Sequence, residues 1–316
     1  MHDRYFYHCF PRRSGTDDLT RVMSVLSSIL ERGLLLTPER ISLRESLADG
    51  NTGPESFILQ KRLCFTELTP SELVSHCKVF GPVAIEWKIP TLIEIGAVPV
   101  FYVPLRETPL SNDGIASSML LRLGEIQELL SRLESLQQVA ARSTNSAEVL
   151  NVTRNGVVAN TSCTVSAARD LLQHLGTDIQ PIGSLTAAVR FLFGYYYPTE
   201  NLKYTGPLGY YRQREWRLLA NGVNRGTPIT EEVSPRDIEA LIGMDQQFFG
   251  RELDFPTGRQ TIAQQCHLMR SFRGVPILMS ASRIIVPGAM LDSVSALVSD
   301  SKLLIELVSL EQYGGA

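Results

Sequence analysis

The amino-acid sequence predicts an α+β fold with a mainly antiparallel mixed sheet that both ends of the chain build. Three strand-like segments, 61–67, 79–89 and 98–103, fall within about forty residues, which leaves no room for repeated crossovers between parallel strands. Strand-like segments return near the other end, at 282–286 and 302–310. The two groups therefore indicate one sheet to which both halves of the chain contribute.

A long amphipathic helix is predicted between these two groups of strands. From 115 to 142, apolar residues recur every three or four positions, as they do in a helix that covers a core or pairs with another helix. This stripe consists of Leu120, Leu123, Ile126, Leu130, Leu133, Leu136 and Ala140. We expect a single α+β domain over residues 1–316, with a helical insert at about 112–194.

The N-terminal segment is predicted to run from a strand into a helix. In the strand 4–10, alternation puts Tyr5, Tyr7 and Cys9 on one face and Phe6, His8 and Phe10 on the other. Apolar spacing from Leu19 predicts a helix that ends before Gly33, a residue typical of the position after a helix. An extended segment, 34–36, then leads to Thr37-Pro38, and a short helix is expected from Ser71.

The remaining elements follow from similar patterns. The segment 143–160 is predicted to be a polar connector with a strand-like pair at Val157-Val158, 254–259 a loop and 276–278 a strand. Further helices are predicted at 166–175, 185–193, 234–249 and 289–299.

Composition indicates an ordinary globular protein and limits the functions to consider. Of the 316 residues, 44% are hydrophobic and 20% charged, and the net charge of −3 provides no overall basic field for nucleic acid. Five scattered cysteines without a CxxC pair argue against a zinc site and for reduced thiols in the cytoplasm. No apolar stretch reaches the roughly 18–20 residues of a membrane span. We expect a cytoplasmic protein that uses no metal.

The stretch 208–222 is the most informative in the chain. Turn residues bound it, and its aromatic and aliphatic residues suit a half-buried strand. Alternation would place Tyr211, Gln213, Glu215 and Arg217 on one face, opposite Trp216 and Leu218. A carboxylate between arginines is costly to place in a sheet, which suggests a functional site. Charge pairing on a wet face of the sheet would explain the same residues.

Five segments, taken in order, resemble the AbiGi group of abortive phage-infection proteins, which are described as antitoxin-like. They are CFTE at 64–67, VFGPVAIE at 79–86, PVFY at 99–102, REWR at 214–217 and RIIVP at 283–287. The resemblance covers most of the chain outside the helical insert. It implies a role in bacterial defence against phage.

A more remote resemblance is to the ADP-ribosyltransferase fold. The first strand carries Tyr7-His8, the segment 26–34 ends a helix at a glycine, and Gln213-x-Glu215 has a spacing that some of these enzymes use. This resemblance implies that NAD is bound. The aromatic residue that would face the nicotinamide stays open among Phe65, Tyr102 and Tyr211.

The resemblance to these transferases also implies a set of site residues. Glu215 would be the key carboxylate, Gln213 would orient the acceptor, and His8 would hydrogen-bond the ribose. The residues expected to bind NAD are Tyr7, Arg12, Arg13, Phe65 and Tyr211.

Each site residue has an alternative interpretation. Glu67 or Glu86 could be the critical carboxylate in place of Glu215. His8 could be a core histidine, and Arg12-Arg13 a solvated loop. His76 and Cys77 do not form a catalytic dyad if they are helical, since neighbouring side chains point about 100° apart.

Two classes of function follow. The first is a phage-defence enzyme that transfers ADP-ribose from NAD or cleaves NAD. The second is a non-catalytic antitoxin or sensor, in which the stripe within 115–142 would hold a protein partner encoded in the same defence operon, or a second copy of this chain. RNA contact through Arg12, Arg13 and 214–217 is a third possibility that the net charge does not favour.

Overall fold

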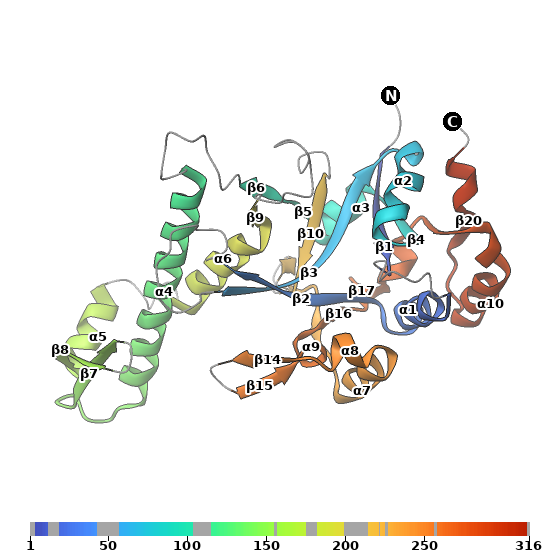
Figure 1. Cartoon of the computed structure of the whole chain (residues 1–316). Coiled ribbons are helices and arrows are strands. Elements are labelled where there is room, and N and C mark those ends of the chain that lie inside the picture. The colour runs from blue at the N-terminus through green and yellow to red at the C-terminus, as the bar shows by residue number, and fades with distance from the viewer. Residues whose placement is uncertain are drawn as a thin grey trace. The chain divides into compact units, whose positions relative to one another are not determined.

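The computed structural model divides the chain into two compact units, one of residues 1–104 and 194–316 and the other of residues 105–193. It describes residues 4–11, 19–42, 57–103, 115–154, 157–174, 182–198, 214–220, 222–224, 227–255 and 258–314. The first unit has the predicted α+β class: strands from both ends of the chain form one mixed, mainly antiparallel sheet (Figure 1).

The first unit contains most of the strands and helices. Its strands are β1 (Tyr5–Phe10), β2 (Leu34–Ser42), β3 (Phe57–Leu68), β4 (Val83–Lys88), β5 (Val98–Pro99), β6 (Phe101–Val103), β9 (Tyr196–Pro198), β10 (Glu215–Leu219), β11 (Val223–Asn224), β12 (Thr227–Pro228), β13 (Glu231–Glu232), β14 (Glu252–Phe255), β15 (Gly258–Thr261), β16 (His267–Met269), β17 (Ser271–Phe272), β18 (Val275–Pro276), β19 (Arg283–Val286) and β20 (Glu306–Ser309). Its helices are α1 (Leu19–Arg32), α2 (Pro70–Phe80), α3 (Ile89–Ile95), α7 (Pro235–Met244), α8 (Gln246–Phe249), α9 (Ile262–Gln265) and α10 (Leu291–Ser301), with the 3₁₀ turns η2 (Ile277–Ser280), η3 (Gly288–Met290) and η4 (Leu310–Tyr313).

The main sheet has the strand order β13-β16-β2-β3-β1-β4-β19-β20, and β10 joins it through β3. Of the pairs in this sheet, β19 and β20 run parallel, because α10 carries the chain from one to the other. The two faces of β1 alternate as predicted. Phe6 and Phe10 belong to a core that includes residues of α1, α3 and α10, whereas Tyr7 packs with Leu73 and Cys77 of α2.

Strand β3 exchanges one neighbour for another along its length. Its residue Arg62 pairs with Thr37 of β2 and with β10, and Thr66 pairs with Tyr7 of β1 and with β10. Because β10 occupies one edge of β3 at both points, β2 and β1 lie one after the other along the opposite edge. The sheet therefore splits at residues 63–65, into a branch that continues through β1 and a branch that continues through β2.

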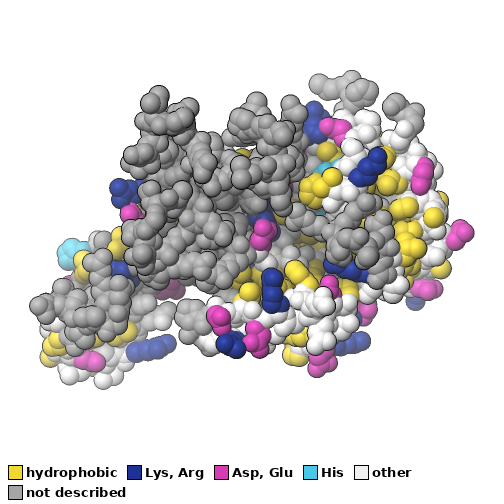
Figure 2. Space-filling view, viewed as in Figure 1, with side chains coloured by type: hydrophobic (Ala, Val, Ile, Leu, Met, Phe, Trp, Pro, Cys, Tyr) yellow, Lys and Arg dark blue, Asp and Glu magenta, His cyan; other side chains and the backbone are white. Residues whose placement is uncertain are grey.

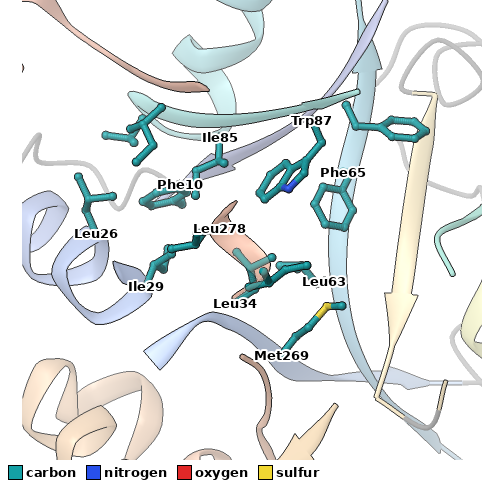
Figure 3. Close-up of a cluster of buried hydrophobic side chains, with 14 of the residues drawn as sticks. Phe10, Leu26, Ile29, Leu34, Leu63, Phe65, Ile85, Trp87, Met269 and Leu278 are labelled. Carbon is teal, nitrogen blue, oxygen red and sulfur yellow. The ribbon is translucent and has the colours of Figure 1, made fainter. Parts of the chain in front are cut away.

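The main core fills the space beside this split (Figure 3). Phe65 and Trp87 meet edge to face at 5.4 Å between ring centroids, and both are essentially inaccessible to solvent. Aromatic pairs in this geometry add about 0.5–1.5 kcal/mol beyond the burial of their area. Aliphatic side chains from α1, β2 and η2 complete the cluster, among them Leu26, Leu34 and Leu278.

The second unit consists of helices and a hairpin. Its elements are α4 (Ile115–Arg142), β7 (Val149–Arg154), β8 (Val157–Thr164), α5 (Val165–His174) and, up to residue 193, α6 (Ile182–Tyr195). The bounds of α4 confirm the predicted helix. Arg169 of α5 fixes the C-terminal end of α4, since its guanidinium donates to the carbonyl of Ala140 at 2.8 Å and to that of Ser143 at 2.6 Å.

Several sequence-based predictions of elements were wrong. The connector predicted at 143–160 contains strand β7, although its strand-like pair Val157-Val158 does start β8, and the described ends of the predicted loop 254–259 belong to strands β14 and β15. Segment 276–278 enters a 3₁₀ turn, and 79–89 includes the end of α2 before β4 begins at Val83. Within the described part of the predicted strand 208–222, β10 confirms the strand over Glu215–Leu219, and it begins after Arg214 because that residue has a positive φ of 45° that is not extended.

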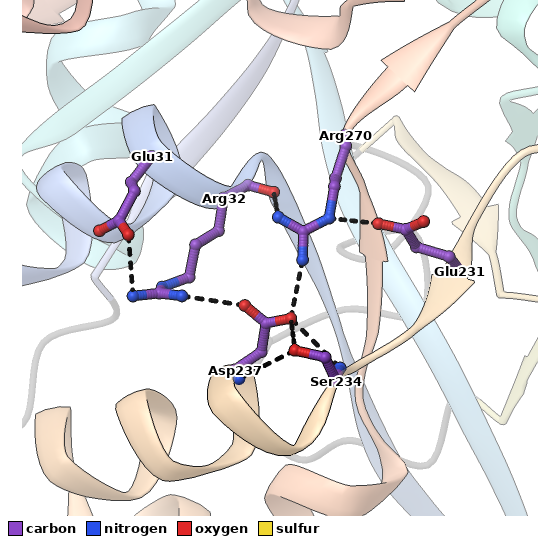
Figure 4. A network of polar contacts seen from close by, with 6 residues as sticks. All are labelled: Glu31, Arg32, Glu231, Ser234, Asp237 and Arg270. Atoms are coloured by element: carbon purple, nitrogen blue, oxygen red, sulfur yellow. Dashed lines mark hydrogen bonds and ion pairs between the residues drawn. The ribbon is translucent and has the colours of Figure 1, made fainter.

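An ion-pair network joins α7 to the end of α1 (Figure 4). The carboxylate of Asp237 accepts from Arg32 at 2.9 Å, from Arg270 at 2.7 Å and from the Ser234 hydroxyl at 2.6 Å. Burial works to raise the pKa of Asp237, but the hydrogen bonds from Ser234 and Arg32 outweigh it and lower the pKa below its usual value. The network therefore stabilises the fold only while Asp237 is ionised.

We expect Asp237→Asn to lower the free energy of unfolding by about 3 kcal/mol, because it leaves two arginines beside a neutral group in a largely buried network. The difference in unfolding free energy between the wild type and the variant should have its full size above the ordinary pKa of an aspartate. It should disappear as the pH falls through the lowered pKa of Asp237 in the folded state. Urea unfolding across this pH range measures both. Asp254→Asn is the matched control, since Asp254 pairs with Arg259 on the surface with 86% of its side chain exposed; an equal loss there would contradict the assignment.

Candidate functional site

A row of polar residues crosses one face of the main sheet. Cross-strand register aligns six of them over six adjacent strands, from β10 to β20. In order they are Glu215, Thr66, Tyr7, Glu86, Arg283 and Glu306. Directly paired residues point to the same face of a sheet, so this row brings three carboxylates, Glu215, Glu86 and Glu306, onto one face of the sheet.

Glu215 is held at one end of the row by two groups. Its Oε1 accepts from Nε of Arg217 at 2.8 Å, and its Oε2 accepts from the hydroxyl of Tyr102 at 3.2 Å. Only 15% of the Glu215 side chain is exposed, and Arg217 is completely buried. Tyr102 was one of the three aromatic residues left open by the sequence, and its hydroxyl meets the carboxylate.

The surroundings of Glu215 favour its ionised form. Burial works to raise the pKa of Glu215, but the charges of Arg217 and Arg62 and the hydrogen bonds from Arg217 and Cys64 lower it below its usual value. The pKa of Cys64 rises to about 12 through burial and the nearby negative charge of Glu215. The pKa of Tyr102 is raised for the same two reasons. At neutral pH the site therefore contains a carboxylate, a neutral thiol and a neutral phenol.

Arg217 is anchored by groups that the sequence did not single out. Its Nη1 donates to the carbonyl of Gly194 at 2.8 Å and to Oε1 of Gln60 at 3.2 Å. Gln60 also accepts from Arg62 at 2.6 Å, and Arg62 forms an ion pair with Glu39. The alternation of Gln60, Arg62 and Cys64 along β3 was the available signal for this second layer.

The structure does not bring His8 to Glu215. Tyr7 lies in the polar row, so its neighbour His8 points to the opposite face, where its ring lies 5.5 Å from Phe10 and 5.9 Å from Phe65. Nδ1 of His8 donates to the carbonyl oxygen of Cys64 at 2.9 Å, within the split of the sheet. Burial lowers the pKa of His8, and the bond to this carbonyl only partly opposes that effect. His8 is a neutral structural group here, and its expected contact with ribose is incorrect for this geometry.

Two of the expected NAD-binding residues are inaccessible. Phe65 and Tyr7 are each 1% exposed: Phe65 lies in the main core, and the Tyr7 hydroxyl donates to Glu86 at 2.9 Å. Neither ring has a face open to nicotinamide, so both assignments are corrected. The remaining expected residues, Arg12, Arg13, Tyr211 and Gln213, lie outside the described residues.

The alternative carboxylates differ sharply from each other. Glu67 pairs with Arg4 at 3.0 Å near the surface. Glu86 is completely buried, and its Oε2 accepts from Tyr7 and, at 3.3 Å, from Tyr313. Burial raises the pKa of Glu86 despite these hydrogen bonds. Glu86 thus favours its protonated form more than Glu215 does.

The remaining candidates separate in space. His76 stacks on Phe80 at 4.3 Å, while Cys77 turns inward to lie 3.8 Å from the sulfur of Cys9, so no His–Cys dyad forms. In the described part of the chain, no three His, Cys, Asp or Glu side chains gather as metal ligands. Among the described helices, none has the length and hydrophobicity to cross a lipid bilayer. On the face seen in Figure 2, basic and acidic side chains of the described residues are interspersed.

The predicted stripe of α4 is largely used within its own unit. Leu130, Leu133 and Leu136 pack around Ala140, with Ala168 and Leu172 of α5. Among the members of the stripe whose side chains the structure describes, Ile126 is exposed, at 45% of its surface. The residues proposed to hold a partner therefore serve mainly as the core of the second unit.

No family model, curated protein or solved structure matches this chain.

His8 should contribute to stability rather than to chemistry. We expect His8→Ala to lower the free energy of unfolding by about 1–3 kcal/mol, because the Cys64 carbonyl loses its donor inside the split. Denaturant unfolding at pH 8 measures this change. His174→Ala is the matched control, since Nδ1 of His174 makes the same type of bond, to the carbonyl of Asp170 at 2.8 Å, on an exposed helix end. Equal changes in the two variants would show that the split does not need His8.

Proposed function

We propose that the protein acts in bacterial defence against phage, in the cytosol, and that its α+β core uses NAD, either to transfer ADP-ribose to an acceptor or to cleave NAD. The resemblance to AbiGi proteins supports the biological role, and the remote resemblance to ADP-ribosyltransferases supports the chemistry. One structural observation carries the site: Glu215 is a largely buried, ionised carboxylate fixed by Arg217 and Tyr102.

The proposed reaction requires an ionised carboxylate beside the ribose. The bond between ribose C1′ and the nicotinamide nitrogen breaks, and nicotinamide leaves with the bonding electron pair. An acceptor group or water then bonds to C1′ and gives up a proton. Positive charge develops on the ribose ring between these steps, and a preorganised negative group stabilises it. Glu215 meets this requirement better than Glu86, whose pKa is shifted in the opposite direction.

The contacts of Glu215 leave capacity for a substrate hydroxyl. A carboxylate offers about four lone-pair positions, and three are used by Arg217, Tyr102 and Cys64, which leaves one for a ligand. The bond from Tyr102, at 3.2 Å, is longer than that from Arg217, so Oε2 is the atom we assign to a ribose hydroxyl. Arg217, fixed by Gly194 and Gln60, would keep the carboxylate oriented during the reaction.

The non-catalytic alternative has less support. It relied on the α4 stripe as a free surface, and three of the leucines of that stripe pack inside the second unit. A protein partner or a second copy would have to use other residues.

We expect the purified protein, incubated with NAD and cell extract, to release nicotinamide, and Glu215→Gln to reduce that release by about 100-fold or more. Tyr102→Phe should reduce it by about tenfold, because it removes one hydrogen bond to the carboxylate. Liquid chromatography of nicotinamide measures both. Glu67→Gln, on the neighbouring strand and near the surface, should match the wild type.

Circular dichroism of Glu215→Gln establishes that the variant is folded. If it is not, Tyr102→Phe carries the test, since it retains the ring and removes only the hydroxyl. Equal release of nicotinamide by these four proteins would overturn the role of Glu215. Glu86→Gln is measured beside them, and a loss of release confined to that variant would overturn the role as well. Plaque counts on cells that express the wild type or Glu215→Gln then test whether the activity protects against phage.

A further inference from the structure

A polar hollow lies at the end of the row opposite Glu215, where β4, β19 and β20 meet. It encloses about 480 Å³, within the range of cavities that bind small molecules. Its lining includes two cations, Lys88 and Arg283, two carboxylates, Glu86 and Glu306, and the hydroxyls of Tyr5, Thr91 and Ser282. They come from four separate parts of the chain, so this wall exists only in the folded protein.

Arg283 is fixed in the wall of the hollow by carboxylates on two sides. Its Nε donates to Glu306 at 2.8 Å, and its Nη1 lies 3.5 Å from the buried carboxylate of Glu86. Glu86 is itself held by the hydroxyls of Tyr7 and Tyr313. The side chain of Arg283 is 37% exposed. The two carboxylates therefore fix the orientation of Arg283 while part of its side chain stays accessible to a ligand.

Lys88 supplies a second cation at the rim. It is exposed at the end of β4, opposite Tyr5 in the register, and within the described residues it makes no ion pair. The hydroxyls of Tyr5, Thr91 and Ser282 add hydrogen-bond donors. Glu306 has one oxygen on Arg283 and is 60% exposed, so its other oxygen can accept from a ligand.

The donors and charges of this hollow fit one class of ligand. Two cations and three hydroxyls suit a group with several anionic oxygens, and a lysine binds a phosphate well as a point charge. The remaining carboxylate oxygen suits a ligand hydroxyl. We propose that the hollow between β4 and β19 binds a small hydroxylated phosphate monoester of about the size of a nucleoside monophosphate, with the phosphate on Lys88 and Arg283 and a hydroxyl on Glu306.

This site is distinct from the one around Glu215. Glu215 and Glu86, which both belong to the row, are three strand spacings apart, about 14 Å. Helix α2 covers the sheet between them, where Leu73 and Cys77 pack on Tyr7. The inference therefore does not depend on the proposed NAD chemistry.

Isothermal titration calorimetry of the full chain with adenosine monophosphate tests the site. We expect saturable binding, a loss of at least tenfold in affinity for Lys88→Gln, and unchanged affinity for Lys78→Gln, a matched exposed lysine on α2. Lys88 makes no side-chain cap bond to α3, so its substitution should leave the fold intact. Glu215→Gln should bind as the wild type does, which separates this test from that of the proposed function.

Adenosine and inorganic phosphate identify the recognised group. Competition by phosphate, with no binding of adenosine, supports phosphate recognition. Equal affinity for adenosine and its monophosphate, equal affinity of Lys88→Gln and the wild type, or no saturable binding at all would each overturn the proposal.

Discussion

The main sheet depends on a single constraint at the centre of β3: this strand must satisfy its backbone groups while one of its neighbours changes from β2 to β1. The carbonyl of Cys64 lies in the interval where neither strand pairs with that edge, and His8 donates to it at 2.9 Å. A buried carbonyl without a hydrogen bond costs about 1–3 kcal/mol. The hydrogen bond from His8 removes that cost and so stabilises the sheet where its two branches meet. The core beside α1 and the polar row that carries Glu215 lie on opposite faces of this sheet.

Alternation along the strands then decides which residues can cooperate. His8 follows Tyr7 directly, and one step along a strand reverses the side of the sheet to which a side chain points. The resemblance to ADP-ribosyltransferases placed His8 and Glu215 in one site, but the register places them on opposite faces. Glu215 is instead hydrogen-bonded by Tyr102, which lies on β6, a strand outside the main sheet.

Patterns within one element were predictable from the sequence, and contacts between elements were not. The faces of β1 and the bounds of α4 follow from local spacing, because periods of 2 and 3.6 residues are fixed by backbone geometry. The unusual character of Glu215 was also visible, since charged groups in a strand are costly. The link from Arg217 to Gln60 spans 157 residues, and that from Arg283 to Glu86 spans 197. No pattern within either segment specifies such a pair, because it depends on strand order and register.

Two carboxylates of the polar row, Glu215 and Glu86, show how one face of a sheet can hold groups with opposite properties. Glu215 lies beside Arg217 and close to Arg62, and this positive charge outweighs burial and keeps it ionised. Glu86 is surrounded mainly by phenols, and its one guanidinium is shared with Glu306, so burial prevails and its pKa rises. A carboxylate that stabilises a developing positive charge must stay ionised. Glu86 only positions Arg283, and it can keep its hydrogen bonds when it is protonated. Glu215 has two guanidinium groups nearby and Glu86 has one, which it shares with Glu306. This difference argues for chemistry at the β10 end of the row and for ligand binding at the β19 end.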